Sequence, residues 1–221
     1  MTQEAKVLLG IGIATIVILI GGVVYLNGTN PQVTSSGTIE KKILVAGKNT
    51  VGSKSAKVMV VEFADFQCPA CGAFHPDLKK IKSDYKDKIY FVYRHFPLPM
   101  HKNARVAAQA AQAAALQGKF WQMHDMLFEK QAEWSEIADP TDLFVAYAKD
   151  LKLDSEKFKK VLTENTGSAV IQKDIDDGNK AGVNATPTIF VNGKKVEGAN
   201  SIADLATQVR SAIDTELQST K

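Results

Sequence analysis

The sequence predicts an α/β domain with an inserted all-helical subdomain, preceded by one N-terminal transmembrane helix. Three observations support this prediction. An uncharged, apolar run of 20 residues occupies positions 7–26. A short β-branched run at 57–63 is followed by a helical pattern that begins at Cys68. The sequence at about 101–181 then shows helical patterns alone, before strand patterns return.

Composition limits the classes of protein to consider. The chain has 221 residues, of which 45% are hydrophobic and 23% charged, as in ordinary globular proteins. This balance excludes collagen-like, low-complexity and disordered chains. The formal net charge is only +3, and no run of five or six like charges occurs, so nucleic acid is excluded as a partner.

The apolar run is the length of a membrane span. A helix of 20 residues is about 30 Å long, which matches the hydrocarbon core of a bilayer. The run has no polar face, which favours a span over a buried core helix. Lys6 precedes it and the first charge after it is Glu40, so the N-terminus is predicted to be cytoplasmic and the rest extracytoplasmic.

This prediction divides the chain into three segments. Residues 1–26 form a cytoplasmic stub and membrane anchor, and residues 27–40 form a flexible linker rich in Asn, Gly, Thr and Ser. Residues 41–221 form the working domain, with the helical insertion at about 101–181. No cleavage site is evident near Leu26, so a retained single-pass anchor is favoured, although a cut at 33–35 stays open.

The start of the domain has the pattern of a buried sheet. The continuous run at 57–63 predicts a central strand, buried on both faces in a parallel sheet. A helix is expected from Cys68 to about Tyr85, kinked near Pro76. A second strand is expected at 88–96, ended by the prolines that follow it.

The rest of the domain divides into helices and a final hairpin. Helices are expected at 104–117, 120–130, 141–151 and 156–164, with one more ending near Gly182. Asp139 and Asp154 supply N-cap chemistry. Strands at 188–191 and 194–197 flank Asn192-Gly193, a strong hairpin signal. Ser201 with Asp204 resembles a capping box and begins the closing helix.

The only cysteines of the chain, Cys68 and Cys71, form one C-x-x-C motif. At the first turn of a helix, Cys68 lies at unpaired N–H groups and the positive end of the helix dipole, which favour its thiolate. Cys71 lies one turn further and can attack a mixed disulfide formed by Cys68. The pattern therefore predicts thiol-disulfide exchange, with Cys68 as nucleophile and Cys71 as resolving thiol.

Structural roles fit this motif less well. A disulfide that closes so short a ring removes little entropy from the unfolded chain, so it is a poor staple. A zinc knuckle needs a second C-x-x-C or a pair of histidines. A C-x-x-C that binds a soft metal is expected to follow a segment rich in glycine or methionine, whereas residues 65–67 are Asp, Phe and Gln. No metal site is predicted. His75 is expected to be an exposed surface residue, and His95, His101 and His124 lack ligand spacing.

Glu62 lies on the predicted central strand, six residues before Cys68. A buried carboxylate there can accept the proton that Cys71 must lose, because burial raises its pKa. A glutamate at a strand end that points to solvent or to a lysine is an equally good interpretation of the residue alone.

Three blocks, in order, resemble the thioredoxin-fold disulfide oxidoreductases of the DsbA type, in the branch with a helical insertion. They read VVEFADFQCPAC (60–71), YRHFPL (93–98) and GVNATPTIFVNG (182–193), and the likeness covers nearly all of residues 50–215. The resemblance implies a thioredoxin-like fold. It also implies that Cys68 attacks, that Cys71 is buried, and that Glu62 is the acid beneath the active site.

The resemblance further implies a threonine and a cis-proline, Thr186 and Pro187, which face the cysteines and bind an extended substrate. Pro69 and Ala70 between the cysteines tune the site. Strongly oxidising members carry Pro-His there, whose histidine helps to stabilise the thiolate, so Ala70 predicts weaker oxidising power. The redox-active disulfide of Cys68 and Cys71 is the only cofactor implied.

These observations predict a membrane-anchored oxidase that forms disulfides in secreted or cell-surface proteins. Its expected partners are reduced, unfolded proteins and a membrane redox partner of the quinone-linked DsbB kind, and the chain is expected to be a monomer. A reductase or isomerase kept reduced by a membrane electron donor is the alternative. A non-catalytic binding module is less compatible, because the motif is intact at Cys68, Cys71, Glu62 and Pro187.

Overall fold

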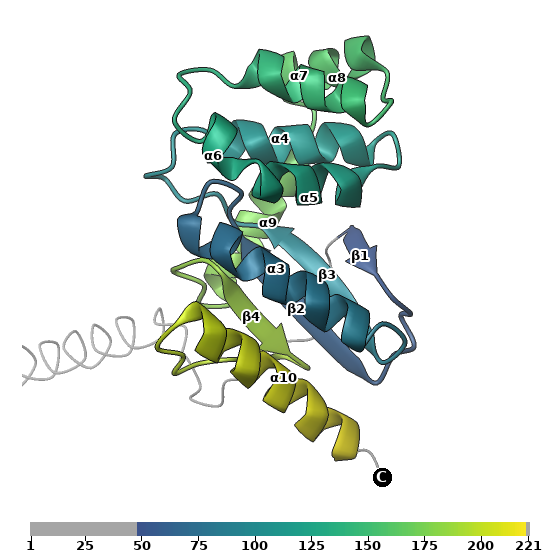
Figure 1. Ribbon diagram of the computed structural model, residues 1–221, viewed down its shortest axis with the longest axis vertical. Helices are drawn as coiled ribbons and strands as arrows, with labels where there is room; N and C mark the ends of the chain where they lie inside the picture. Colours follow the sequence, from purple (N-terminus) through teal and green to yellow (C-terminus); the bar gives the residue numbers. More distant parts are fainter. Residues whose placement is uncertain (1–47, 220–221) are drawn as a thin grey trace, which may run out of the picture. The chain divides into compact units, whose positions relative to one another are not determined.

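Two buried parallel strands form the centre of the sheet in the computed structural model, which describes residues 48–219 (Figure 1). These strands are β2 (Val58–Ala64) and β3 (Ile89–His95), and every residue in them is buried. The sheet has five strands in the order β1-β3-β2-β4-β5, so β2 is central. Both predicted strands are confirmed to within one residue.

The remaining strands make the sheet mixed, so the prediction of a parallel sheet was wrong in part. β1 (Asn49–Val51) pairs antiparallel with β3, and β4 (Thr188–Val191) pairs antiparallel with β2 and with β5 (Lys194–Lys195). β2 is buried because helices cover both faces of the sheet, whatever the direction of its neighbours. The predicted hairpin turn is confirmed: Asn192 and Gly193 have φ of 47° and 85°, as a type I′ turn requires.

The two faces of the sheet carry different helices. α3 (Pro69–Asp84) and α10 (Ile202–Gln218) pack together on one face, and α9 (Ser168–Lys180) contacts β3 (Figure 1). Val58 and Val60 belong to the core cluster that contains α3, whereas Met59 and Val61 belong to the cluster on the opposite face. Side chains alternate along a strand, so Glu62 faces α3.

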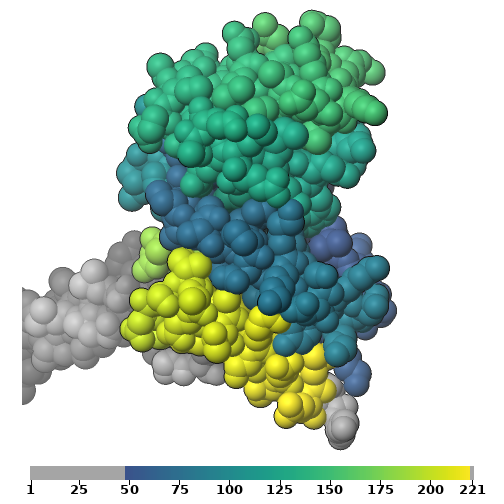
Figure 2. Space-filling model, in the orientation of Figure 1, coloured from purple at the N-terminus to yellow at the C-terminus, as the bar shows by residue number. Residues whose placement is uncertain are grey.

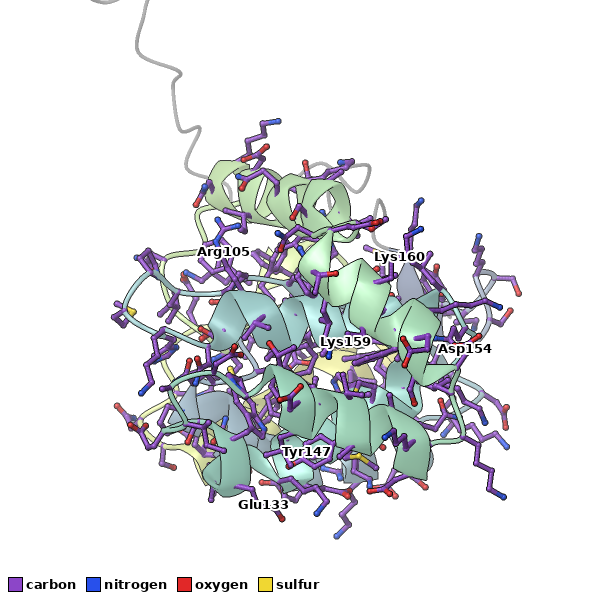
Figure 3. All side chains as sticks on the ribbon, turned by 90° about the horizontal axis from the view of Figure 1, so that it is seen from above. Arg105, Glu133, Tyr147, Asp154, Lys159 and Lys160 are labelled. Atoms are coloured by element: carbon purple, nitrogen blue, oxygen red, sulfur yellow. The ribbon has the colours of Figure 1, made fainter. Side chains whose placement is uncertain are left out.

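The helical insertion stacks at one end of the sheet (Figures 1 and 2). It comprises α4 (Ala104–Ala115), α5 (Phe120–Glu129), α6 (Gln131–Trp134), α7 (Thr141–Asp150) and α8 (Ser155–Thr163). The four longer helices are confirmed to within two residues. All alanines of α4 except Ala115 are buried, and the helix packs against α5, α7 and α8. The short α6 was not predicted. Its Glu133 accepts a hydrogen bond of 3.0 Å from Tyr147 of α7 (Figure 3).

The predicted helix starts are confirmed by their hydrogen bonds. Asp154 accepts from the Lys157 N–H at 3.0 Å, and Ser201 accepts from the Asp204 N–H at 3.1 Å. Asp139 accepts from the Thr141 N–H, although Pro140 occupies the N-cap position itself. These residues satisfy donors that a helix leaves unpaired at its start.

The predicted membrane span at 7–26 and linker at 27–40 lie outside the described residues. Within residues 48–219, no helix combines the length and the apolar composition needed to cross a bilayer.

Candidate active site

Cys68 lies where the chain passes from the central strand into α3. It occupies the N-cap position, with φ of −66° and ψ of 122°, and Pro69 begins the helix. Its side chain is 7% exposed, and its Sγ lies 3.4 Å from the carbonyl oxygen of Thr186. Both cysteines are free thiols. The predicted placement of Cys68 at a helix start is therefore confirmed.

The Cys68 thiol is unusually acidic. A hydrogen bond from the Cys71 thiol is the largest cause, and it lowers the pKa of Cys68 to about 5 against the opposing effect of burial. The backbone N–H groups of Ala70 and Cys71 also favour the thiolate. At neutral pH, reduced Cys68 is therefore mostly the nucleophilic thiolate.

Cys71 has the opposite character. Its side chain is 1% exposed, and burial raises its pKa well above the ordinary value. The negative charges of Cys68 and Glu62 raise it further. Cys71 thus keeps its proton as long as Cys68 is a thiolate.

Glu62 is a buried acid on the α3 face of β2. Its side chain is 1% exposed, and burial raises its pKa to about 7, with Lys82 acting against the shift. Its Oε2 atom is buried without a hydrogen-bond partner. Burial in turn lowers the pKa of Lys82, whose Nζ lies 4.6 Å from the centre of the Trp121 ring. Glu62 is therefore buried rather than pointing to solvent, and it can exchange a proton near neutral pH.

The loop before β4 lies opposite Cys68. The Thr186-Pro187 peptide bond is cis, as the resemblance implied, and the Thr186 side chain is 8% exposed. A pocket of about 540 Å³ lies beside Pro187, with Val196 and Ile202 among its lining residues. Within the motif, Pro69 is exposed and Ala70 packs against the core.

Asp65, which the sequence did not single out, fixes the turn that presents Cys68. Its side chain is fully buried and accepts hydrogen bonds of 2.8 Å from the N–H groups of Gln67 and Leu98. His101 Nδ1 lies 2.6 Å from its Oδ2 atom. The Asp65 carbonyl accepts from the Cys68 N–H at 3.1 Å. One carboxylate thus connects this turn to the loop that follows β3.

Gln131 of α6 supports the same turn from the helical insertion. Its Nε2 atom donates to the carbonyls of Phe66 at 2.7 Å and Cys68 at 3.0 Å. A Cβ atom at Gly72 would lie 2.6 Å from Gln131 Oε1, so a side chain at this position would displace Gln131. The glycine after Cys71 was the only sequence signal for the contact.

The expectation that His75 is exposed was wrong. Its side chain is 3% exposed, because this side of α3 packs against α5. The ring stacks on Phe128 at 5.1 Å and lies 5.3 Å from the ring of His124, which is also buried. The fold thus brings together two histidines that show no ligand spacing in the sequence.

Comparisons with known proteins agree with this geometry. A family model described as thioredoxin matches residues 45–211. Disulfide bond formation protein D of Bacillus subtilis is 32% identical over 179 residues, which cover 79% of each chain. The chain is also 41% identical over 162 residues to Na⁺/H⁺ antiporter NhaA 1 of Salinispora arenicola, but it spans only 24% of that protein's length.

Solved structures share the fold. Oxidised BdbD from Bacillus subtilis superposes with a TM-score of 0.70 and 32% identity, over 83% of this chain and 97% of that one. A thioredoxin-like oxidoreductase from Silicibacter pomeroyi has a TM-score of 0.66 and 24% identity, over 81% of this chain and 99% of that one. The chain therefore belongs to the thioredoxin family and groups with its DsbA-type thiol-disulfide oxidoreductases.

Proposed function

We propose that this chain is an extracytoplasmic protein disulfide oxidase, in which the Cys68–Cys71 disulfide accepts two electrons from a pair of substrate thiols. The observation that carries the proposal is the opposite character of the two thiols. A low pKa at Cys68 stabilises the reduced protein at neutral pH, because the thiolate forms at little cost. Stabilising the reduced form makes the disulfide a stronger oxidant.

The reaction has two exchange steps. A substrate thiolate attacks the Cys68 sulfur, forms a mixed disulfide and releases Cys71 as a thiolate. Glu62, with a pKa of about 7, donates a proton to Cys71, whose own pKa is higher. The second substrate thiolate then attacks the substrate sulfur of the mixed disulfide. The substrate disulfide forms, and Cys68 departs as a stable thiolate.

The loop at Thr186 and Pro187 provides the docking surface. Proline fixes its own backbone and lacks an N–H, and it holds the residue before it away from helical conformation. An extended substrate segment can then pair with the backbone at Thr186, beside Cys68, and place side chains in the pocket next to Pro187. This mode selects unfolded chains over folded ones.

The apolar run at 7–26 supports the proposed location. It would hold the domain at the membrane on the extracytoplasmic side, where disulfides persist. Each cycle leaves the cysteine pair reduced, so a partner must remove two electrons. A quinone-linked membrane protein, brought close by the same anchor, meets this requirement.

The equilibrium reduction potential of the full chain tests the proposed direction. Measured in glutathione buffers, it is expected to lie above about −180 mV, the value of protein disulfide isomerase. An Ala70→His variant is expected to lie higher still, because a histidine in the motif adds a stabilising charge. A potential near about −270 mV, that of thioredoxin, would instead favour a reductase.

A further inference from the structure

One group of metal-ligating side chains stands apart from the cysteines within residues 48–219. It consists of His75 on α3 with His124 and Asp125 on α5. One ligand atom from each residue lies within 4.8 Å of the other two. Asp125 Oδ1 is 2.9 Å from His124 Nδ1 and 3.7 Å from His75 Nε2.

Three of the four ring nitrogens in this group lack a hydrogen-bond partner, and the fourth, His124 Nδ1, pairs with Asp125. Neither ring nitrogen of His75 has a hydrogen-bond partner, and His124 Nε2 has none. Both side chains are at least nine-tenths buried, at 3% and 0% exposure. A buried polar group without a partner destabilises the folded chain, and native proteins keep few such groups. A ligand between His75 Nε2 and Asp125 would satisfy the nitrogen that faces the carboxylate.

We propose that His75, His124 and Asp125 bind one divalent transition-metal ion of the Zn²⁺ class. Two imidazoles and a carboxylate suit Zn²⁺ and related ions, whereas Ca²⁺ and Mg²⁺ prefer oxygen ligands alone. Zinc–nitrogen bonds of about 2.0–2.1 Å place tetrahedral ligand atoms about 3.3 Å apart. Asp125 Oδ1 lies 2.9 Å from His124 Nδ1 and 3.7 Å from His75 Nε2, on either side of that value, and the ion would replace the hydrogen bond between His124 Nδ1 and Asp125.

An ion can reach this group through Asp125. The Asp125 side chain is 32% exposed and lines a pocket of about 380 Å³, together with Trp121 and Lys82. Lys79 Nζ lies 3.6 Å from Asp125 Oδ2, but it also forms a closer ion pair of 2.8 Å with Glu129. Lys79 therefore competes with a cation at Asp125, which limits affinity without occupying the histidines.

A metal here would join the active-site helix to the helical insertion. His75 lies one helical turn after Cys71 on α3, and both other ligands belong to α5. An ion that binds the folded chain alone raises its stability. The metal would thus hold in place the helix that carries both cysteines.

Calorimetric titration of Zn²⁺ into the oxidised full chain tests the proposal. The disulfide removes Cys68 and Cys71 as zinc ligands, so binding reports on other residues. We expect one Zn²⁺ per chain, an increase in Tm, and affinity at least tenfold weaker in Asp125→Asn. Asp176→Asn is the matched control, because Asp176 is an exposed helical aspartate on α9. It should bind Zn²⁺ as the unchanged chain does.

Two further variants make the test independent of folding defects. His75→Phe keeps an aromatic ring against Phe128 but removes both nitrogens, and it should also weaken binding at least tenfold. Its Tm without Zn²⁺ shows whether it folds. Lys79→Gln should bind more tightly, because a competing charge is removed.

Three results would overturn the proposal. The first is no binding by the oxidised chain, which leaves water as the partner of these residues. The second is binding by the reduced chain alone, which assigns the ion to the cysteines. The third is unchanged affinity in Asp125→Asn, His75→Phe or Lys79→Gln.

Discussion

Cys68 and Cys71 lie only one helical turn apart, yet their surroundings differ in almost every respect that affects a thiol. Cys68 stands at the open N-terminus of α3 and contacts backbone N–H groups and the loop at Thr186. Cys71 lies one turn further, above a buried acid and fully removed from solvent. One side of this turn favours negative charge and the other opposes it.

An exchange reaction of this kind needs two unlike thiols rather than two reactive ones. Cys68 leaves easily from a mixed disulfide because its thiolate is stable. Cys71 is hidden from substrates, so it reacts only with its neighbour. The fold produces this asymmetry by placing a helix N-terminus at the end of a buried strand, with Glu62 under the helix.

Removing each thiol in turn should give the largest effects. Cys68→Ser is expected to abolish oxidation of a reduced protein substrate, because no sulfur remains accessible for the first exchange. Cys71→Ser, given a protein substrate that already carries a disulfide, should instead trap Cys68 in mixed disulfides, because Cys68 can attack the substrate disulfide but no neighbouring thiol can then release the substrate. The trapped species would be visible at high mass on non-reducing gels. Trapping by Cys68→Ser, with none by Cys71→Ser, would reverse the assigned roles.

Glu62→Leu should raise stability in a pH-dependent way. In the unfolded chain Glu62 ionises near 4.5, but in the folded chain only near 7. Below pH 4.5 the folded and the unfolded chain both keep the Glu62 proton, so Glu62 costs the folded chain no stability. Between pH 4.5 and 7 the unfolded state releases it first, so the cost to the folded state grows. Above pH 7 the cost is on the order of 3 kcal/mol.

Urea unfolding of the oxidised chain at pH 4 and pH 8 measures this effect. Glu62→Leu should gain stability mainly at pH 8, while its exchange rate falls because Cys71 lacks a proton donor. Glu136→Leu, at a side chain 89% exposed, is the control and should show no such pH difference. An equal gain for Glu62→Leu at both pH values would mean that Glu62 is not a buried acid.

The smallest expected effect concerns the turn that holds Cys68. Gln131→Ala removes two hydrogen bonds to that turn and should cost about 1–2 kcal/mol. Gln117→Ala is the control: it also removes two hydrogen bonds, but these bind the backbone of Asp154 instead of the turn at Cys68. Its loss of stability should be similar. Urea unfolding and thiol titration would compare the two. Only Gln131→Ala should raise the pKa of Cys68. A higher Cys68 pKa in both variants would mean that the shift follows from lower stability in general rather than from loss of the Gln131 contact.

The sequence allowed the central strands, the longer helices and the cysteine pair to be predicted, because these depend on local patterns. Periodicity indicates a strand or a helix, and the C-x-x-C after a strand predicts a thiol at a helix start. The three residues of β1 and the four of α6 are too short to show a period. The direction of β4 depends on its partner strand rather than on its own residues.

The missed parts of the site depend on contacts between distant segments. Asp65 meets Leu98 and His101, and Gln131 meets Phe66, across 33 to 65 positions of the chain. His75 was expected to be exposed because nothing near it in the sequence shows that α5 covers it. Burial and pairing of this kind follow only from the tertiary structure.

Titration of the Cys68 thiolate is the sharpest test of the proposed difference between the two thiols. The reduced full chain is followed by its ultraviolet thiolate absorbance as the pH rises, with Cys68→Ser as the blank. We expect one step near pH 5 from Cys68, and no second step before strongly alkaline pH, because Cys71 is buried. A Cys68 step at pH 8 or above, or ionisation of Cys71 first, would contradict the asymmetry on which the proposed oxidase rests.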